Sequence, residues 1–374
     1  MGTMPTKYTI DPNGDVIITL RNFGTPFAVL QKNNELYIPT KISPPFVSFA
    51  VWQGEKSQSL NNGVGYKPVK VAPPEPGENT VTSEAQIEPS TTPPEIHLQV
   101  SSAHLTLASR YFKTAFGGPF TESKPDADGL RHVDASDWDT WALLIVLRII
   151  HGRNCQVPRS LDLEMLAKVA VIVDYYKCYE AVDAFAEIWL QRIKGTLLLG
   201  SFDRDLILLL HISCVFRWTE GFKAVTKTVL HHSKGPLDTL NLPIPEKVTF
   251  TINNRRIAAL RKIAFALGAL ATRFRQEPPD CSFECASMNL GALSRQIHNN
   301  WSLNSVVSGS GSFDGHSIAL VMDAARKIRS PDWSCSNYPK RPGPFCRLDR
   351  LIKSDMDKIE NLDGLSLKDF GQSI

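Results

Sequence analysis

The chain has 374 residues, which allows two or three domains of about 100–200 residues each. Apolar residues make up 43% of the chain and charged residues 21%, and 41 basic side chains against 38 acidic ones leave a formal charge of only +3. This balance is typical of a globular protein and gives no global sign of nucleic-acid binding. No apolar run reaches about 18 residues, so we expect no membrane-spanning helix. The cysteines number seven, which favours a reducing compartment, and we expect an intracellular protein of the nucleus or cytoplasm.

Two groups of β-forming residues near the N-terminus predict a hairpin or two adjacent strands over 15–30. The groups are Asp15-Val16-Ile17-Ile18-Thr19-Leu20 and Phe27-Ala28-Val29-Leu30. The stretch 31–94 then holds 10 of the 25 prolines and few large apolar residues. Such a composition cannot bury enough apolar surface to offset the entropy of ordering the chain. We expect a disordered insertion here, with one short strand around 36–38.

A strand followed directly by a helix is predicted after the insertion. Residues 96–100 alternate apolar and polar side chains, as a half-buried strand does. Leu105, Ser109, Phe112 and Phe116 then recur at spacings of four, three and four, which places them on one face of a single helix. Gly117-Gly118-Pro119 ends that helix.

The rest of the chain has helical periodicity. Helices are predicted over 141–150, 161–176, 181–193, 206–216, 221–230, 248–275, 286–299, 318–328 and 348–359. The first of these ends at Gly152, and the aspartates before it, Asp134, Asp137 and Asp139, are expected to cap its N-terminus. The pattern predicts an α+β N-terminal domain over 10–195 and an all-α C-terminal domain over 196–374.

The N-terminal part resembles the BTB (POZ) fold, and is closest to the divergent BTB-like proteins of fungi. The likeness rests on an ordered series of features. They are the Asp15-Val16 strand, the set Leu105, Ser109, Phe112 and Phe116, the pair Glu122-Ser123, the helix end Ile149-Ile150-His151-Gly152 and the final helical pair from 161. The resemblance covers about residues 10–195, interrupted at 31–94, and implies a domain that binds other proteins or a second copy of itself.

One departure from the family bears on self-association. BTB proteins usually carry a His and a basic residue at the start of the signature helix, where this chain has Ser101 and Ser102. In many BTB dimers that basic residue pairs with the early acidic residue, here Asp15. Ser102 cannot supply the positive charge, so we expect Asp15 to be exposed or bonded to backbone.

A resemblance to BTB proteins that recruit cullin ubiquitin ligases singles out Phe120-Thr121-Glu122. Those proteins use an apolar residue, any residue and then Glu in the loop after the signature helix. The resemblance implies a ubiquitin-ligase substrate adaptor in which Phe120, Glu122 and the first strand at Asp15 contact the partner. The alternative is that Phe120 covers the domain core and Glu122 is a solvated loop acid.

No motif of enzyme chemistry is present in the sequence, and we expect no catalytic residue and no cofactor. The glycines Gly309, Gly311 and Gly315 form a Gly/Ser loop that matches neither a P-loop nor a dinucleotide fingerprint. Cys281, Cys285, His298 and Cys346 are the residue types that bind structural zinc, but their spacing is irregular. Small buried thiols are the preferred interpretation, and no metal is expected.

The long helix over 255–275 carries a basic face with Arg255, Lys262 and Arg273 opposite an apolar stripe. This face suggests the alternative function of a nuclear regulator that contacts nucleic acid. It has no interleaved aromatic residues, so a solvated helix face is preferred and nucleic acid is not the expected partner. The sequence therefore predicts a non-enzymatic BTB-type scaffold or adaptor that binds proteins.

Overall fold

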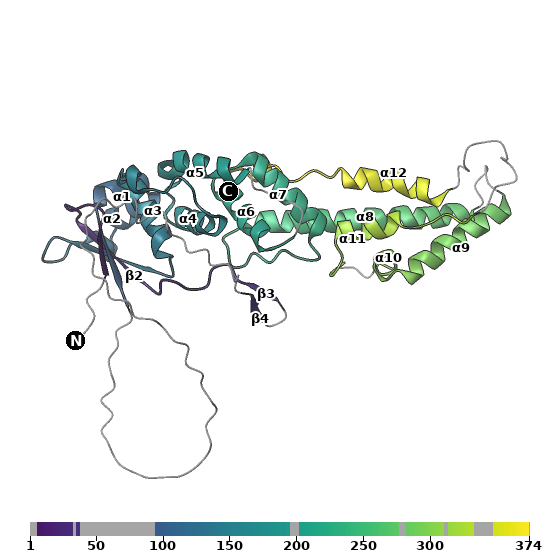
Figure 1. The fold of residues 1–374 in the computed structure, drawn as a ribbon, viewed down its shortest axis with the longest axis horizontal. Helices are drawn as coiled ribbons and strands as arrows, with labels where there is room; N and C mark the ends of the chain where they lie inside the picture. Colours follow the sequence, from purple (N-terminus) through teal and green to yellow (C-terminus); the bar gives the residue numbers. More distant parts are fainter. Residues whose placement is uncertain are drawn as a thin grey trace, which may run out of the picture.

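Four strands form a small mixed sheet at one end of an elongated molecule (Figure 1). The structure is a computed structural model that describes residues 6–32, 35–37, 94–194, 202–276, 282–309, 313–332 and 347–373. The strands of the sheet are β1 (Thr6–Thr9), β2 (Val16–Arg21), β5 (Ile96–Val100) and β6 (Arg131–Ser136). Their order is β1-β5-β2-β6, with β2 antiparallel to β5 and parallel to β6. The predicted α+β class is confirmed.

Strand β2 has β5 on one side and β6 on the other, so the predicted hairpin or pair of adjacent strands over 15–30 is wrong. Positive φ angles at Asn22 (53°), Gly24 (90°) and Ala28 (48°) turn the chain away from β2. The next strand, β3 (Leu30–Lys32), pairs instead with β4 (Glu35–Tyr37) in a separate two-stranded sheet. The short strand expected around 36–38 is confirmed as far as Tyr37. Residues 33–34 and 38–93 of the predicted insertion lie outside the described residues.

The predicted single helix over 105–116 is two helices, α1 (Ser102–Ala108) and α2 (Arg110–Gly117). Ser109 separates them because its backbone is extended, with φ −131° and ψ 123°. Its hydroxyl accepts a hydrogen bond from Phe112 N at 3.1 Å and donates one to the carbonyl oxygen of Tyr176. This one buried side chain therefore caps α2 and ties it to the end of a later helix.

We expect Ser109→Ala to lower the free energy of unfolding by about 1–2 kcal/mol, because it removes the cap and leaves the Tyr176 carbonyl without its donor. Urea unfolding followed by circular dichroism measures the change. Thr114→Ala is the matched control, since it deletes an exposed hydroxyl that bonds only within α2, to Arg110 O. An equal loss in the two variants would contradict the role given to Ser109.

Three helices pack beside this unit, and the first is capped as the sequence predicts. They are α3 (Thr140–Ile150), α4 (Leu163–Tyr176) and α5 (Tyr179–Lys194). Asp139 accepts hydrogen bonds from Trp141 N and Ala142 N at 2.9 and 3.1 Å. The expectation that Asp134 and Asp137 share this role is wrong, because Asp134 lies on β6 and pairs with Arg21 at 2.6 Å, while Asp137 forms the turn with φ 66°.

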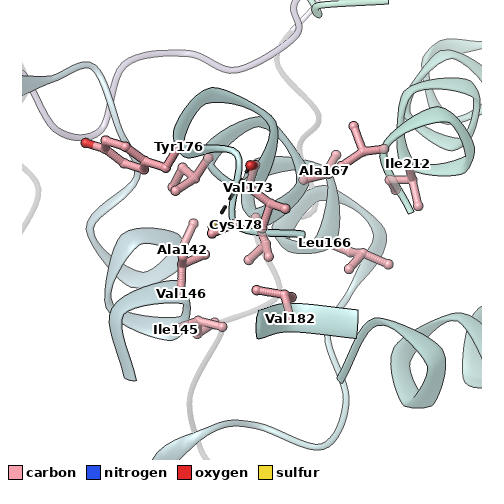
Figure 2. Packing of buried hydrophobic residues seen from close by; sticks show 14 of the residues in the cluster. Ala142, Ile145, Val146, Leu166, Ala167, Val173, Tyr176, Cys178, Val182 and Ile212 are labelled. Carbon is pink, nitrogen blue, oxygen red and sulfur yellow. Dashed lines mark hydrogen bonds between the residues drawn. The ribbon is translucent and has the colours of Figure 1, made fainter. Parts of the chain in front are cut away.

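The first hydrophobic core joins the sheet to helices α3–α5 and continues into α6 (Arg204–Val215) and α7 (Thr219–His232). Figure 2 shows Ile212 of α6 beside Ala167 of α4, and Val182 of α5 facing the same interior as Ile145 and Val146 of α3. The predicted domain boundary at 195/196 lies in a segment, 195–201, outside the described residues. The apolar core itself extends across that position in the sequence.

A second hydrophobic core occupies the far end of the molecule, where helices α9–α12 surround α8 (Figure 1). These helices are α8 (Glu246–Arg275), α9 (Phe283–Asn299), α10 (Trp301–Val307), α11 (Ile318–Arg326) and α12 (Leu348–Glu360). Val248 and Ile252 of α8 belong to the first core, whereas its residues from Ala259 to Phe274 belong to the second. The segment after α12 returns to the first core, where Leu365 and Phe370 are buried.

None of the described helices combines the length and the apolar character needed to cross a membrane.

Candidate functional site

The loop after α2 presents Phe120 on a short, internally bonded turn. Phe120 is 49% exposed and precedes a 3-10 turn over Thr121–Ser123. Ser123 fixes the turn, because its hydroxyl donates to Phe120 O at 2.7 Å and its N–H donates to the same oxygen at 3.2 Å. The Phe120 ring lies against Gly118, where a Cβ would come within 2.7 Å of it. The ring therefore packs against Gly118 on one side, while about half of the Phe120 side chain faces solvent.

Glu122, on the same turn, lies at the edge of an aromatic cluster. Its carboxyl accepts a hydrogen bond from the Thr121 hydroxyl at 3.1 Å. Tyr111 of α2 packs on Tyr175 of α4 with ring centroids 5.3 Å apart, and Trp138 contacts Tyr175 at 5.1 Å. Burial, the hydrogen bond with Tyr175 and the nearby charge of Glu122 together raise the pKa of Tyr111 to about 12. Glu122 thus places a negative charge beside a partly exposed aromatic surface.

Asp15 has a cationic partner that the sequence did not reveal. The carboxylate of Asp15 accepts hydrogen bonds from Ser102 N and from the Ser102 hydroxyl, both at 2.7 Å, so the predicted backbone bond is confirmed. The missing positive charge comes from Arg131 of β6, whose guanidinium lies 2.7 Å from Asp15. Partial burial alone would raise the pKa of Asp15, but the bonds from Ser102 and the charge of Arg131 lower it overall. Asp15 is thus ion-paired within its own chain.

The other residues of the family-like series are structural. Leu105 and Phe112 are fully buried, Ser109 is 2% exposed, and Phe116 stacks on Phe112 with ring centroids 5.6 Å apart. Gly152 adopts φ 66° just after α3, a conformation that favours glycine at a helix end. Leu105, Ser109, Phe112 and Phe116 therefore pack inside the domain, and Gly152 lets the chain turn at the end of α3.

The candidate zinc ligands do not come together within the described residues. Cys285 is buried on α9, where its sulfur accepts a hydrogen bond from Asn289 at 3.5 Å, and His298 is exposed near the other end of the same helix. Their separation of thirteen residues corresponds to about 20 Å of helix, too far for both to bind one ion. Cys281 and Cys346 lie outside the described residues. Among the described residues, no three His, Cys, Asp or Glu side chains are grouped to hold a metal.

The basic residues of α8 are placed as predicted. Arg255, Lys262 and Arg273 are exposed, while Leu260, Ile263, Leu267, Leu270 and Phe274 form the buried stripe. Two features of this helix were not predicted from the sequence. Arg256 is completely buried, and Phe265, which lies between Lys262 and Arg273 in the sequence, is 77% exposed.

In comparisons with known proteins, no family model, no curated protein and no solved structure matched this chain.

Proposed function

We propose that this chain is a non-enzymatic, BTB-type scaffold or adaptor, and that the loop Phe120–Ser123 docks the N-terminal domain of a cullin. The resemblance supports this proposal, together with the way β5 leads into α1 and α2 and ends at that loop. The mechanism is burial of surface and no chemical step. An apolar anchor beside a charge is the kind of contact that concentrates binding energy in an interface.

The observation that carries the proposal is the exposure of Phe120. A phenylalanine that served only to close the core would be buried, but half of this ring faces solvent on a turn that its own hydrogen bonds hold. Part of the ordering cost of binding is already met, because the hydrogen bonds of the turn fix the backbone from which the ring projects. Glu122 then meets a polar or basic group at the edge of that pocket.

The test is the mass of the complex, measured by light scattering after gel filtration with a purified cullin N-terminal domain. We expect a co-eluting complex that Phe120→Ala and Glu122→Ala each weaken by about 10-fold or more. Leu107→Ala is the matched control, since Leu107 is an 88% exposed apolar residue on α1, outside the loop. It should leave the complex intact.

Separate masses for the wild-type chain and the cullin domain would reject cullin recruitment. A fall in the unfolding temperature of the Phe120→Ala or Glu122→Ala protein would instead show that these side chains are structural. The mass of the chain alone reports whether it dimerises. Because Asp15 is already paired with Arg131, we expect no dimer held by that carboxylate.

A further inference from the structure

A groove of about 720 Å³ runs between α8 and α12 in the half of the molecule far from the sheet. On α8 its wall is formed by Arg261, Phe265, Ala269 and Arg273. Because these residues recur every four positions, they lie in one row along the helix. The row spans twelve residues, or about 18 Å, which is about three turns of a helix lying alongside.

The α12 wall of the groove is also partly apolar. Leu351, Asp355 and Lys358 line it from the helix, and Leu362 lines it from the segment just after α12, which ends at Glu360. The neighbouring stripe of α12, formed by Leu348, Ile352, Met356 and Ile359, is buried in the second core, and Ile352, Met356 and Ile359 also line the groove. Leu351 and Leu362 are only half-buried. Leu351 and Leu362 therefore pack against the second core and still leave part of their apolar surface at the groove.

Phe265 lies in the middle of the α8 row and is 77% exposed. A single exposed aromatic residue is ordinary on a protein surface. This one stands within a groove whose neighbouring residues, Ala266, Ala269 and Leu270, are apolar. The combination provides a central anchor surrounded by aliphatic surface, which is the arrangement of a helix-binding groove.

The rim of the groove is basic and not neutralised. Arg261, Lys262 and Arg273 are exposed, and no acidic side chain among the described residues forms an ion pair with them. Among the described residues that line the groove, the one acidic side chain is Asp355, which pairs with Lys358 at 3.0 Å. Helix α8 itself has a single acidic residue, Glu246, at its opposite end. The occupant that complements this rim carries negative charge.

We propose that the groove binds an acidic amphipathic helix of a partner protein. Apolar residues on one face of that helix cover Phe265, Leu351 and Leu362, while Asp and Glu residues beside that face meet Arg261, Lys262 and Arg273. A nucleic acid is the weaker fit, because single strands stack on several aromatic side chains and this groove has one. This inference uses a different surface from the cullin-binding loop and does not depend on it.

The test is fluorescence anisotropy of the full chain with a labelled, designed peptide of about 15 residues, or four helical turns. The peptide places Leu along one face at the spacing of a helix stripe and Glu on both flanks. We expect saturable binding that Phe265→Ser weakens by about 10-fold or more and that Arg261→Glu also weakens. Added salt should reduce the affinity, and a peptide with Lys in place of Glu should not bind.

Phe250→Ser is the matched control, because Phe250 is 65% exposed on the same helix and lies outside the groove. It should leave binding unchanged. Absence of saturable binding at about 100 µM chain overturns the proposal. Binding of a labelled single-stranded DNA that is lost in Arg261→Glu and kept in Phe265→Ser assigns the surface to nucleic acid instead. If the wild-type chain is a dimer and Phe265→Ser converts it to a monomer, the groove binds a second copy of this chain instead.

Discussion

Replacing Arg256 with Met is expected to lower the free energy of unfolding by about 3 kcal/mol, through loss of charge-assisted hydrogen bonds inside the second core. The Arg256 guanidinium is fully buried and donates to Phe313 O at 2.9 Å and His316 O at 2.8 Å. It also donates to the Asn253 side chain at 3.0 Å. Methionine fills a similar volume but satisfies neither carbonyl, so the segment before α11 loses its attachment to α8.

Urea unfolding of the full chain measures this loss, and Arg255→Met is the matched control. Arg255 is the preceding residue on the same helix and is exposed, so its replacement removes the same charge without breaking a buried contact. We expect the control to change stability by less than about 0.5 kcal/mol. Equal effects of the two substitutions would show that net charge on α8, and not the buried bonds of Arg256, determines the result.

Acid is expected to destabilise the first core through His211. This side chain is fully buried on α6, and neither ring nitrogen has a hydrogen-bond partner among the described residues. Burial lowers the pKa of His211 from 6.5 to about 4, against a smaller opposite effect of the Asp174 charge. As the pH falls through this range, the unfolded chain takes up a proton before the folded chain does. Stability is therefore lost between pH 6.5 and 4, by about 3 kcal/mol in all.

His211→Leu should remove this loss, because leucine cannot be protonated in either state. We expect the variant to match or exceed the wild-type stability at pH 7, since the buried ring has no hydrogen bond to lose. Urea unfolding at a series of pH values compares the two proteins. His298→Leu, on the exposed face of α9, serves as control. Parallel pH curves for wild type and His211→Leu would contradict the assignment.

The long helices could be predicted from the sequence because their apolar stripes are regular. Helix α8 was expected over 248–275 and extends from Glu246 to Arg275. Its stripe from Leu260 to Phe274 is buried as its spacing predicts. Helix α10 was missed because it has only seven residues, held by the cap at Asn300. A helix that short has too few positions to establish a period.

The errors in the N-terminal part arise where contacts distant in sequence decide the local structure. The spacing of Leu105, Ser109 and Phe112 fits one helix, yet the hydrogen bond from Ser109 to Tyr176 favours a break between two helices. Strand β6 has no clear strand signal in the sequence, since only Val133 and Ala135 are buried in it. Its pairing with β2 joins segments more than a hundred residues apart.

The same distinction between local patterns and contacts distant in sequence applies to the candidate sites. The exposed position of Phe120 and the basic face of α8 could be anticipated from local sequence. The pairing of Asp15 with Arg131 could not, because the two residues are 116 positions apart. Phe265 carries a local signal of exposure, since it falls outside the buried stripe formed by Leu260, Ile263, Leu267, Leu270 and Phe274.

Because α8 is continuous, its length sets the distance between the two hydrophobic cores. Its N-terminal residues Val248 and Ile252 are anchored in the first core, and its later turns form the centre of the second. One helix of 30 residues is about 45 Å long. An adaptor with a flexible linker lets its two partners sample many separations. In this chain α8 joins the two cores without a linker, so the distance between the groove and the Phe120 loop is fixed. Under the two proposals made above, inserting helical turns into α8 would lengthen the separation between the two bound partners.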